Sequence, residues 1–217
     1  MHTVIVSGGN IQEDFALSFL KEVPWDKLIA ADRGLEFLWG RGIMPTHIVG
    51  DFDSNDPTVL ERYRGCPEIQ IRTFNPVKDA TDTQIAVELA LELGSAKITI
   101  LGGMGSRLDH TLGNVQTLAL ALEAGVECEL LDEKNRVRLI QTPLTIKREE
   151  QYGDYISLLP LTSVVKGVNL IGFKYPLTNH TFTSAGSAGF GVSNEILGEE
   201  GRIELSEGIF ILIEARD

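Results

Sequence analysis

Residues 97–122 read KITILGGMGSRLDHTLGNVQTLALAL, and this stretch decides the fold class. Its first five residues form an apolar run typical of a short buried strand, and glycines at 102, 103 and 105 end that run. Apolar residues then recur three or four positions apart, the spacing of one helical face: Leu108, Leu112, Val115, Leu118 and Leu122. The order strand, glycine loop, helix predicts one unit of a parallel sheet covered by helices.

The same order recurs through the first ~135 residues. Short apolar runs, most of them ended by Gly or Asp, predict further strands at 3–7, 27–31, 47–49, 68–72 and 127–131. A helix is predicted to begin after Thr81, since Gln84 follows at capping-box spacing, and to end at Gly94. We therefore predict an α/β domain over 1–135, with a mainly parallel sheet and helices on both faces.

The pattern of predicted secondary structure changes after Asp132. Strand-like runs follow one another without helical spacing between them, at 137–141, 144–147, 155–160, 164–169, 191–194, 202–205 and 209–214. Short strands at near-regular spacing are typical of an antiparallel sandwich or barrel. We predict an all-β domain over 136–217, following the α/β domain without a proline-rich or Gly/Ser linker.

Charge and composition exclude several classes of protein. The chain has 217 residues and a formal net charge of −12, which argues against broad contact with nucleic acid or an anionic membrane. No apolar run approaches the ~18 residues of a membrane-spanning helix, and the N-terminus lacks the basic region of a signal peptide. The two cysteines, Cys66 and Cys128, are far apart, and they favour a cytoplasmic location over a disulfide framework.

Carboxylates follow two of the predicted strands. Asp51 and Asp53 come directly after the apolar run 47–49 and can point to the same side of an extended segment. Two such carboxylates suit Mg²⁺, although a plain turn is the alternative interpretation. Asp82 fits the first turn of a helix for electrostatic reasons alone, whereas Asp79 lies before the helix cap and has no such explanation.

Glycine loops follow three other strands and suit an anionic ligand. The loop at 102–105 lets backbone N–H groups approach phosphate, and Arg107 adds a permanent positive charge. It is neither a Walker A loop nor a GxGxxG motif. Gly8, Gly9 and Asn10 follow the first strand, and Asp32 follows the second. Convergence of these loops at one sheet edge predicts a polyphosphate site.

The second half offers one comparable stretch, Gly-Phe-Gly-Val-Ser-Asn-Glu at 189–195. One interpretation is a strand with glycine bulges. The other is a small polar notch in which Ser193 and Asn194 hydrogen-bond the edge of a heterocycle. The pattern by itself favours the bulged strand.

Four of these motifs together resemble one known family. Gly-Asp-Phe-Asp-Ser at 50–54, Lys-Asp-Ala-Thr-Asp at 78–82, Gly-Gly-Met-Gly-Ser-Arg-Leu-Asp-His at 102–110 and Gly-Val-Ser-Asn-Glu at 191–195 are similar, in this order, to bacterial thiamine pyrophosphokinases. The resemblance extends over essentially the whole chain. It implies transfer of the terminal diphosphate of ATP to the hydroxyethyl group of thiamine, with release of AMP.

The resemblance also implies a cofactor and site residues in the α/β domain. The cofactor is Mg²⁺, surrounded with the phosphates by Asp51, Asp53, Asp79 and Asp82. The implied catalytic residues are Asp53, Arg107 and Asp109. The implied ATP contacts are Gly8, Gly9, Asn10, Asp32 and Arg107. Some family members carry Asp-Gln-Asp where this chain has Val-Lys-Asp at 77–79, so this chain lacks one of the two carboxylates and carries Lys78 in the same segment.

The all-β domain is implied to bind thiamine through Ser193 and Asn194. The family resemblance further implies a homodimer, with thiamine in a cleft between the α/β domain of one subunit and the β-sandwich of the other. Two other functions fit parts of the pattern: a sugar-nucleotide transferase, because Asp-Phe-Asp at 51–53 matches a metal-binding DxD motif, and a non-enzymatic nucleotide or vitamin sensor.

Overall fold

The fold is taken from a computed structural model, which describes residues 1–50, 57–73, 80–105 and 107–217. It divides into two compact units, Met1–Glu133 and Lys134–Asp217. Each unit is described by itself.

The first unit is built on parallel strands in the order β4-β3-β2-β1-β5-β6. Their bounds are β1 His2–Val6, β2 Lys27–Ala31, β3 His47–Gly50, β4 Gln70–Thr73, β5 Lys97–Leu101 and β6 Glu127–Leu131. Most residues of β1, β2, β3, β5 and β6 are buried. This explains their nearly continuous apolar sequences, because a parallel sheet is covered on both faces.

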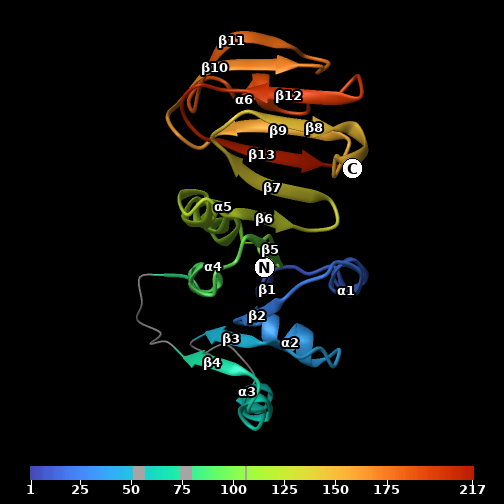
Figure 1. The fold of residues 1–217 in the computed structure, drawn as a ribbon, viewed down its shortest axis with the longest axis vertical. Coiled ribbons are helices and arrows are strands. Elements are labelled where there is room, and N and C mark those ends of the chain that lie inside the picture. The colour runs from blue at the N-terminus through green and yellow to red at the C-terminus, as the bar shows by residue number, and fades with distance from the viewer. Residues whose placement is uncertain (51–56, 74–79, 106) are drawn as a thin grey trace. The chain divides into compact units, whose positions relative to one another are not determined.

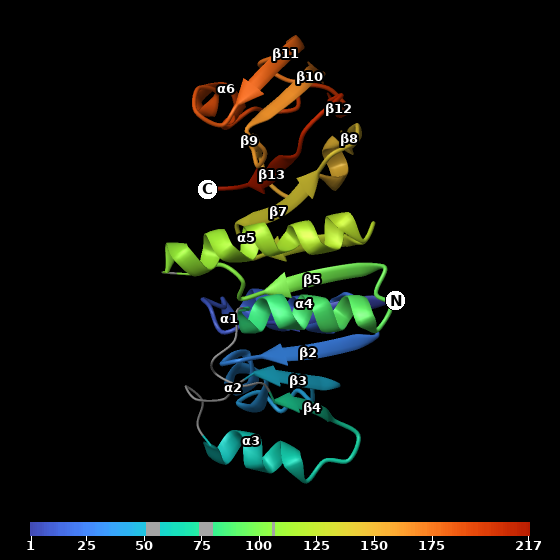
Figure 2. The ribbon, with the colours of Figure 1, turned by 90° about the vertical axis from the view of Figure 1, so that its left-hand side faces the viewer.

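Helices cover both faces of this sheet. Figure 1 shows α4 and α5 on one side of the strands and α1 and α2 on the other, and Figure 2 looks onto α4 and α5. The bounds are α1 Glu13–Glu22, α2 Gly34–Trp39, α3 Pro57–Arg64, α4 Asp82–Glu92 and α5 Leu108–Glu123. Within the described ranges, no helix is both long and apolar enough to cross a membrane.

The predicted limits of α4 are confirmed, and the predicted apolar face of α5 is only partly buried. The Thr81 hydroxyl accepts from the backbone N–H of Gln84 at 3.2 Å, and Gly94 has φ +81°. In α5, Val115 and Leu118 are buried, but Leu108 and Leu112 are 71% and 60% exposed. The first turn and a half of α5 therefore presents apolar side chains that nothing in the described chain covers.

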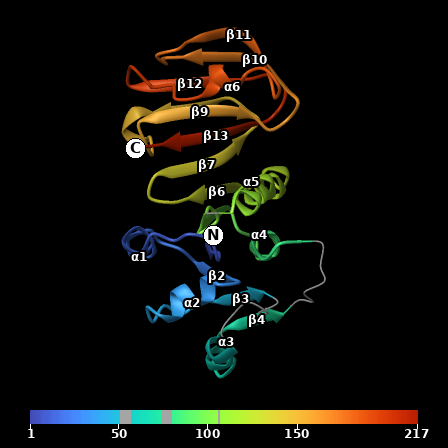
Figure 3. The same ribbon diagram turned by 180° about the vertical axis from the view of Figure 1, so that it is seen from behind.

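The second unit is an antiparallel sandwich, as predicted. One layer has the order β7-β13-β9 and the other β11-β10-β12-β8; Figure 3 shows both from behind. The bounds are β7 Asn135–Ile140, β8 Leu144–Lys147, β9 Tyr155–Pro160, β10 Val164–Ile171, β11 Leu177–Thr183, β12 Glu200–Glu204 and β13 Phe210–Ala215, with a 3-10 turn at Arg148–Glu150 and a short helix α6 at Ala188–Gly191.

Apolar side chains from both layers form one core. Phe182 of β11 and Phe210 of β13 are fully buried and meet edge to face, with ring centroids 5.0 Å apart. An edge-to-face pair of this kind adds to the burial energy of the two rings. Contact between side chains of the two layers establishes the sandwich.

Two local predictions in this unit were wrong. Residues 191–194 are not a strand: α6 ends at Gly191, and Ser193 has φ +56°. A Cβ at Gly191 would lie 2.0 Å from the carbonyl oxygen of Leu158, so this glycine permits close backbone packing. The strand β11 was missed, because its sequence, LTNHTFT, is mostly polar and only Phe182 within it is buried.

A buried charge cluster links β7 to β13. The Glu214 side chain is fully buried, and one of its oxygens accepts from Arg136 Nε at 2.6 Å and from an Arg138 terminal nitrogen at 2.8 Å. Its other oxygen accepts from the backbone N–H of Tyr152 at 3.1 Å. Both Glu214 oxygens are therefore satisfied, as a buried carboxylate requires.

Candidate functional site

Two glycine loops interlock at the carboxyl edge of the parallel sheet. The backbone N–H of Gly9 donates to the carbonyl of Gly102 at 2.9 Å, and that of Asn10 donates to the carbonyl of Met104 at 3.0 Å. A Cβ at Gly9 would lie 2.4 Å from the Gly102 oxygen, so a larger residue does not fit this contact. The loops that follow β1 and β5, predicted to share one site, do lie together.

The loop that follows β2 joins the same group. A Cβ placed on Gly8 would lie 3.0 Å from Asp32 Oδ2 and 3.0 Å from Arg33 Cβ. Asp32 has φ +50°, an uncommon backbone conformation for a residue with a side chain. Its backbone N–H donates to the carbonyl of Val49 at 3.1 Å, which ties this loop to β3. Strain of this kind is typical of functional loops.

The first turn of α4 also reaches this edge. The Ser7 hydroxyl, at the end of β1, lies 3.0 Å from the Thr83 hydroxyl, and both side chains are buried. Asp82 is the first residue of α4 and the neighbour of Thr83. The structure therefore places the first turn of α4, which begins at Asp82, beside the end of β1.

A hollow of about 270 Å³ lies among these loops. It is lined by the loop after β1 and the start of α2: Ser7, Gly8, Gly9, Ile11, Arg33, Glu36 and Phe37. Arg33 and Glu36 form an ion pair at 3.8 Å. Arg33, Glu36 and Phe37 were not among the predicted site residues. The available signal was the position of Arg33 directly after Asp32 in a loop already assigned to the site.

Arg107 and Asp109 form a two-point contact at the start of α5. Arg107 donates from Nε to Asp109 Oδ1 at 3.2 Å and from a terminal nitrogen to Oδ2 at 2.6 Å, with both side chains exposed. The hydrogen bond from Arg107, and then that from the His110 backbone N–H, lower the pKa of Asp109 to about 2. In this arrangement Asp109 holds the guanidinium in one orientation.

Three predicted metal ligands, Asp51, Asp53 and Asp79, lie outside the described residues. The strand that precedes Asp51 in the sequence, β3, ends at Gly50. In the described part of the chain, no three His, Cys, Asp or Glu side chains gather in a way that could hold a metal ion.

The predicted thiamine residues lie in the second unit, between α6 and β12. Ser193 is exposed and has φ +56°. Asn194 is 4% exposed, and its amide bonds within the protein. The two neighbours therefore differ: only Ser193 offers its side chain to solvent.

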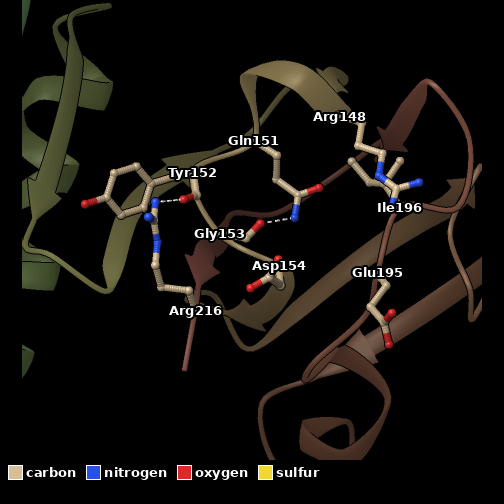
Figure 4. Close-up of a pocket in the computed structure, with 8 residues that line it drawn as sticks. All are labelled: Arg148, Gln151, Tyr152, Gly153, Asp154, Glu195, Ile196 and Arg216. Atoms are coloured by element: carbon tan, nitrogen blue, oxygen red, sulfur yellow. Dashed lines mark hydrogen bonds between the residues drawn. The ribbon is translucent and has the colours of Figure 1, made fainter.

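A larger hollow of about 380 Å³ lies beside this stretch (Figure 4). It is lined by Arg148, Gln151, Tyr152, Gly153, Asp154, Glu195, Ile196 and Arg216. In Figure 4 the guanidinium of Arg216 faces Tyr152, and its centre lies 4.5 Å from the tyrosine ring centroid. None of the predicted site residues lines this hollow, although Glu195 follows Asn194 directly.

Comparison with known proteins gives the family. The model described as "Thiamin pyrophosphokinase, catalytic domain" matches residues 22–130, and the model described as "Thiamin pyrophosphokinase, vitamin B1 binding domain" matches residues 141–210. The chain belongs to the thiamin pyrophosphokinase family. The first match falls inside the α/β unit and the second inside the sandwich, so the thiamin pyrophosphokinase domains follow the structural division.

Individual thiamin pyrophosphokinases agree over the full length. The thiamine pyrophosphokinase of Bacillus subtilis (strain 168) is 32% identical over 218 residues, which are 98% of each chain. A crystal structure of the enzyme from Bacillus subtilis has a TM-score of 0.87 at 31% identity and covers 100% of both chains. That from Geobacillus thermodenitrificans has a TM-score of 0.85 at 30% identity, covering 100% of this chain and 98% of its own.

Gly9→Ala is expected to destabilise the fold. The added methyl would meet the Gly102 oxygen at 2.4 Å and the Met104 oxygen at 2.9 Å, so the interlocked loops must separate. We expect a loss of about 1–3 kcal/mol in unfolding free energy. Gly113→Ala is the control: it lies within α5 with open space at its Cβ and is expected to stabilise by about 0.5–1 kcal/mol. Equal stability of the two variants in urea unfolding would contradict the interlock.

Proposed function

We propose that this chain is a thiamine diphosphokinase, which transfers the diphosphate of ATP to the hydroxyethyl oxygen of thiamine and releases AMP. The observation that carries this proposal is the match to both thiamin pyrophosphokinase domains in one chain. Full-length similarity to the Bacillus subtilis enzyme supports it. The convergence of the loops after β1, β2 and β5 supplies the kind of edge at which α/β sheets bind phosphorylated ligands.

The α/β unit is the proposed ATP site. Gly8, Gly9 and Asn10 carry the loop that borders the hollow beside Asp32, and a glycine loop allows close backbone approach to phosphate. Arg107 presents a permanently charged guanidinium suited to phosphoryl oxygens. We propose that it lies against the transferred group.

Asp51, Asp53, Asp79 and Asp82 are the proposed Mg²⁺ ligands. Four carboxylates are hard oxygen donors, the type that Mg²⁺ prefers together with substrate phosphates. Mg²⁺ bound there would neutralise charge on the phosphates of ATP. The proposal rests on this donor chemistry and on the position of the first turn of α4, which begins at Asp82, beside the end of β1.

The proton of the thiamine hydroxyl needs an acceptor. A general base works best when its pKa lies near the working pH, and a pKa of about 2 makes Asp109 a poor one. We assign Asp109 the role of orienting Arg107, with which it makes two hydrogen bonds. Asp53 is then the proposed acceptor; as a Mg²⁺ ligand it too would have a low pKa, so it would act through its position and not through its basicity.

The sandwich is the proposed thiamine domain, and Ser193 is its proposed contact. Ser193→Gly is expected to raise the KM for thiamine about tenfold, the worth of one lost hydrogen bond, and to leave the KM for ATP unchanged. Glycine accepts φ +56° more readily than serine, so the melting temperature should not fall. Steady-state kinetics measures the two KM values, and thermal unfolding measures the melting temperature. An unchanged KM for thiamine would remove Ser193 from the site.

A homodimer is proposed, with the active site shared between subunits. Exposed apolar side chains occur in both units: Leu108 and Leu112 on α5, and Phe190, Val192 and Leu197 around the Ser193 stretch. Clusters of this kind are typical of surfaces that a partner covers. Analytical ultracentrifugation measures the mass directly. We also propose a reducing, cytoplasmic location, in keeping with two free cysteines.

Product analysis tests the activity. The protein is incubated with ATP, Mg²⁺ and thiamine, and the nucleotides are separated. We expect AMP and thiamine diphosphate in equal amounts. ADP in place of AMP would mean transfer of a single phosphoryl group, and intact ATP would mean a binding protein without turnover.

A further inference from the structure

Asn194 and Ser193 are neighbours in the proposed thiamine site, but their side chains have different surroundings. We infer that Asn194 is a positioning residue, which acts on thiamine only by holding Ser193 in place. This inference rests on the proposed function. In this inference the Ser193 side chain contacts the substrate, and the Asn194 side chain holds the backbone of Ser193 in place.

The side-chain amide of Asn194 is almost fully used within the protein. Its Oδ1 accepts from the backbone N–H of Tyr175 at 3.0 Å and from that of Glu195 at 2.9 Å. Its Nδ2 donates to the carbonyl of Tyr175 at 2.9 Å. An asparagine amide has two acceptor and two donor positions, so only one N–H is left. With the residue 4% exposed, little of this amide is available to a ligand.

The partners also determine the orientation of the amide. Oδ1 faces two N–H donors and Nδ2 faces a carbonyl oxygen, so exchanging the two atoms would break all three bonds. The two bonds to Tyr175 use both of its backbone polar groups. The Asn194 side chain thus replaces a peptide unit of a neighbouring strand.

The backbone of Asn194 is fastened on its other side to β9. Its N–H donates to the carbonyl of Ile156 at 2.9 Å, and its carbonyl accepts from the Ile156 N–H at 2.8 Å. One residue earlier, the backbone N–H of Ser193 donates to the Ser157 hydroxyl at 3.0 Å. Asn194 therefore connects β9 to the Tyr175 segment, through its backbone on one side and its amide on the other.

The following residues continue this connection as an antiparallel pairing. Lys174 donates its backbone N–H to the carbonyl of Glu195 at 2.8 Å, and Phe173 forms an isolated bridge with Ile196. Lys174 Nζ and the Glu195 carboxylate also form an ion pair at 2.5 Å. Asn194 is the first position of the pairing, directly after the chain turns at Ser193.

This anchoring matters because Ser193 has an unfavourable backbone conformation. A φ of +56° lies in the left-handed region, which is energetically unfavourable for a residue with a side chain. Such a conformation persists only where the surrounding structure imposes it. Without the Asn194 amide, Ser193 would be expected to relax to an ordinary φ and carry its hydroxyl away from the substrate.

A double-mutant cycle on the full-length protein separates positioning from direct binding. The variants are Ser193→Gly, Asn194→Ala and both together, assayed for KM of thiamine, KM of ATP and kcat. We expect each single variant to raise the KM for thiamine about tenfold, with the KM for ATP unchanged. The double variant should be no worse than Ser193→Gly alone, because Asn194 has no hydroxyl left to position. Multiplication of the two effects to about a hundredfold would show that Asn194 binds thiamine itself and would overturn the inference.

Asn169→Ala is the matched control for a merely structural role. Its amide also accepts from a backbone N–H, that of Asn179 at 2.8 Å, and donates to Glu204 at 2.9 Å. It is expected to lower the melting temperature without changing the KM for thiamine. If it raises that KM as much as Asn194→Ala does, the effect is general loosening and the inference fails.

A replacement variant and an assay of the wild-type protein complete the experiment. If Asn194→Ala does not fold, Ser157→Ala replaces it in the cycle, since it removes the acceptor of the Ser193 N–H, and the same lack of additivity is expected. The wild-type protein is assayed first for AMP formation. If the wild-type protein forms no AMP, the proposed function is contradicted. If the wild type is active and the effects of the two substitutions on the KM for thiamine multiply, only the role of Asn194 is contradicted.

Discussion

Asp53→Asn and Asp79→Asn are each expected to lower kcat by at least about 10²–10³-fold while leaving the fold intact. A phosphoryl-transfer enzyme works chiefly by positioning and by stabilising charge, and one preorganised group of this kind contributes roughly 3–4 kcal/mol to the transition state. The amide of asparagine keeps the size of the carboxylate and removes its charge. Bound Mg²⁺ would therefore be held less tightly, and excess Mg²⁺ should restore part of the activity.

The matched control is Asp26→Asn. Asp26 precedes β2, at the amino edge of the sheet and so opposite the candidate site, and its carboxylate accepts from the backbone N–H of His2 at 2.7 Å. This variant loses the same charge but is expected to keep kcat within about twofold. Near-normal kcat in both Asp53→Asn and Asp79→Asn would show that these carboxylates do not form the metal site.

Glu214→Ala is expected to cost about 3–5 kcal/mol of unfolding free energy, the largest effect on stability among the substitutions considered. The Glu214 carboxylate is fully buried and accepts hydrogen bonds from Arg136, Arg138 and the Tyr152 N–H. Its removal leaves two guanidinium groups largely inside the protein without their counter-charge. Unfolding in urea, followed by the loss of β-sheet circular dichroism, measures the decrease in unfolding free energy.

Glu207→Ala is the comparison for Glu214→Ala. It removes a carboxylate that pairs with Lys166 at 2.8 Å at the surface, where both side chains are more than half exposed. Surface pairs of this kind contribute between about zero and 1 kcal/mol. If the two variants unfold at the same urea concentration, the buried cluster is not an important source of stability.

Much of the fold could be predicted because the buried strands carry a strong pattern. β2, β5, β6, β8 and β9 lie at the predicted residues. The errors occur where a strand is mostly polar or backbone geometry is unusual. β11 presents one buried side chain, so its sequence has no clear alternation, and Ser193 adopts a left-handed conformation that residue type alone does not predict.

The site could be predicted as a set of loops but not as a set of contacts. Parallel strands bring their carboxyl ends to one edge, so the convergence of Gly9 with Gly102 follows from strand order. The two-point contact of Arg107 with Asp109 and the internal bonding of the Asn194 amide depend on side-chain directions. No spacing rule gives these directions, because neighbouring residues in a loop share no fixed periodicity.

The position of β13 has a consequence for biosynthesis. β13 is the middle strand of its layer, paired with β7 on one side and β9 on the other, yet it is the last of the three to be synthesised. Ribosomes add roughly 5–20 residues per second, so the nascent chain spends several seconds with β7 and β9 lacking their shared neighbour. Strand edges open in this way can pair with another chain. We therefore expect the yield of native protein to depend on translation rate and chaperone supply through the late arrival of this strand.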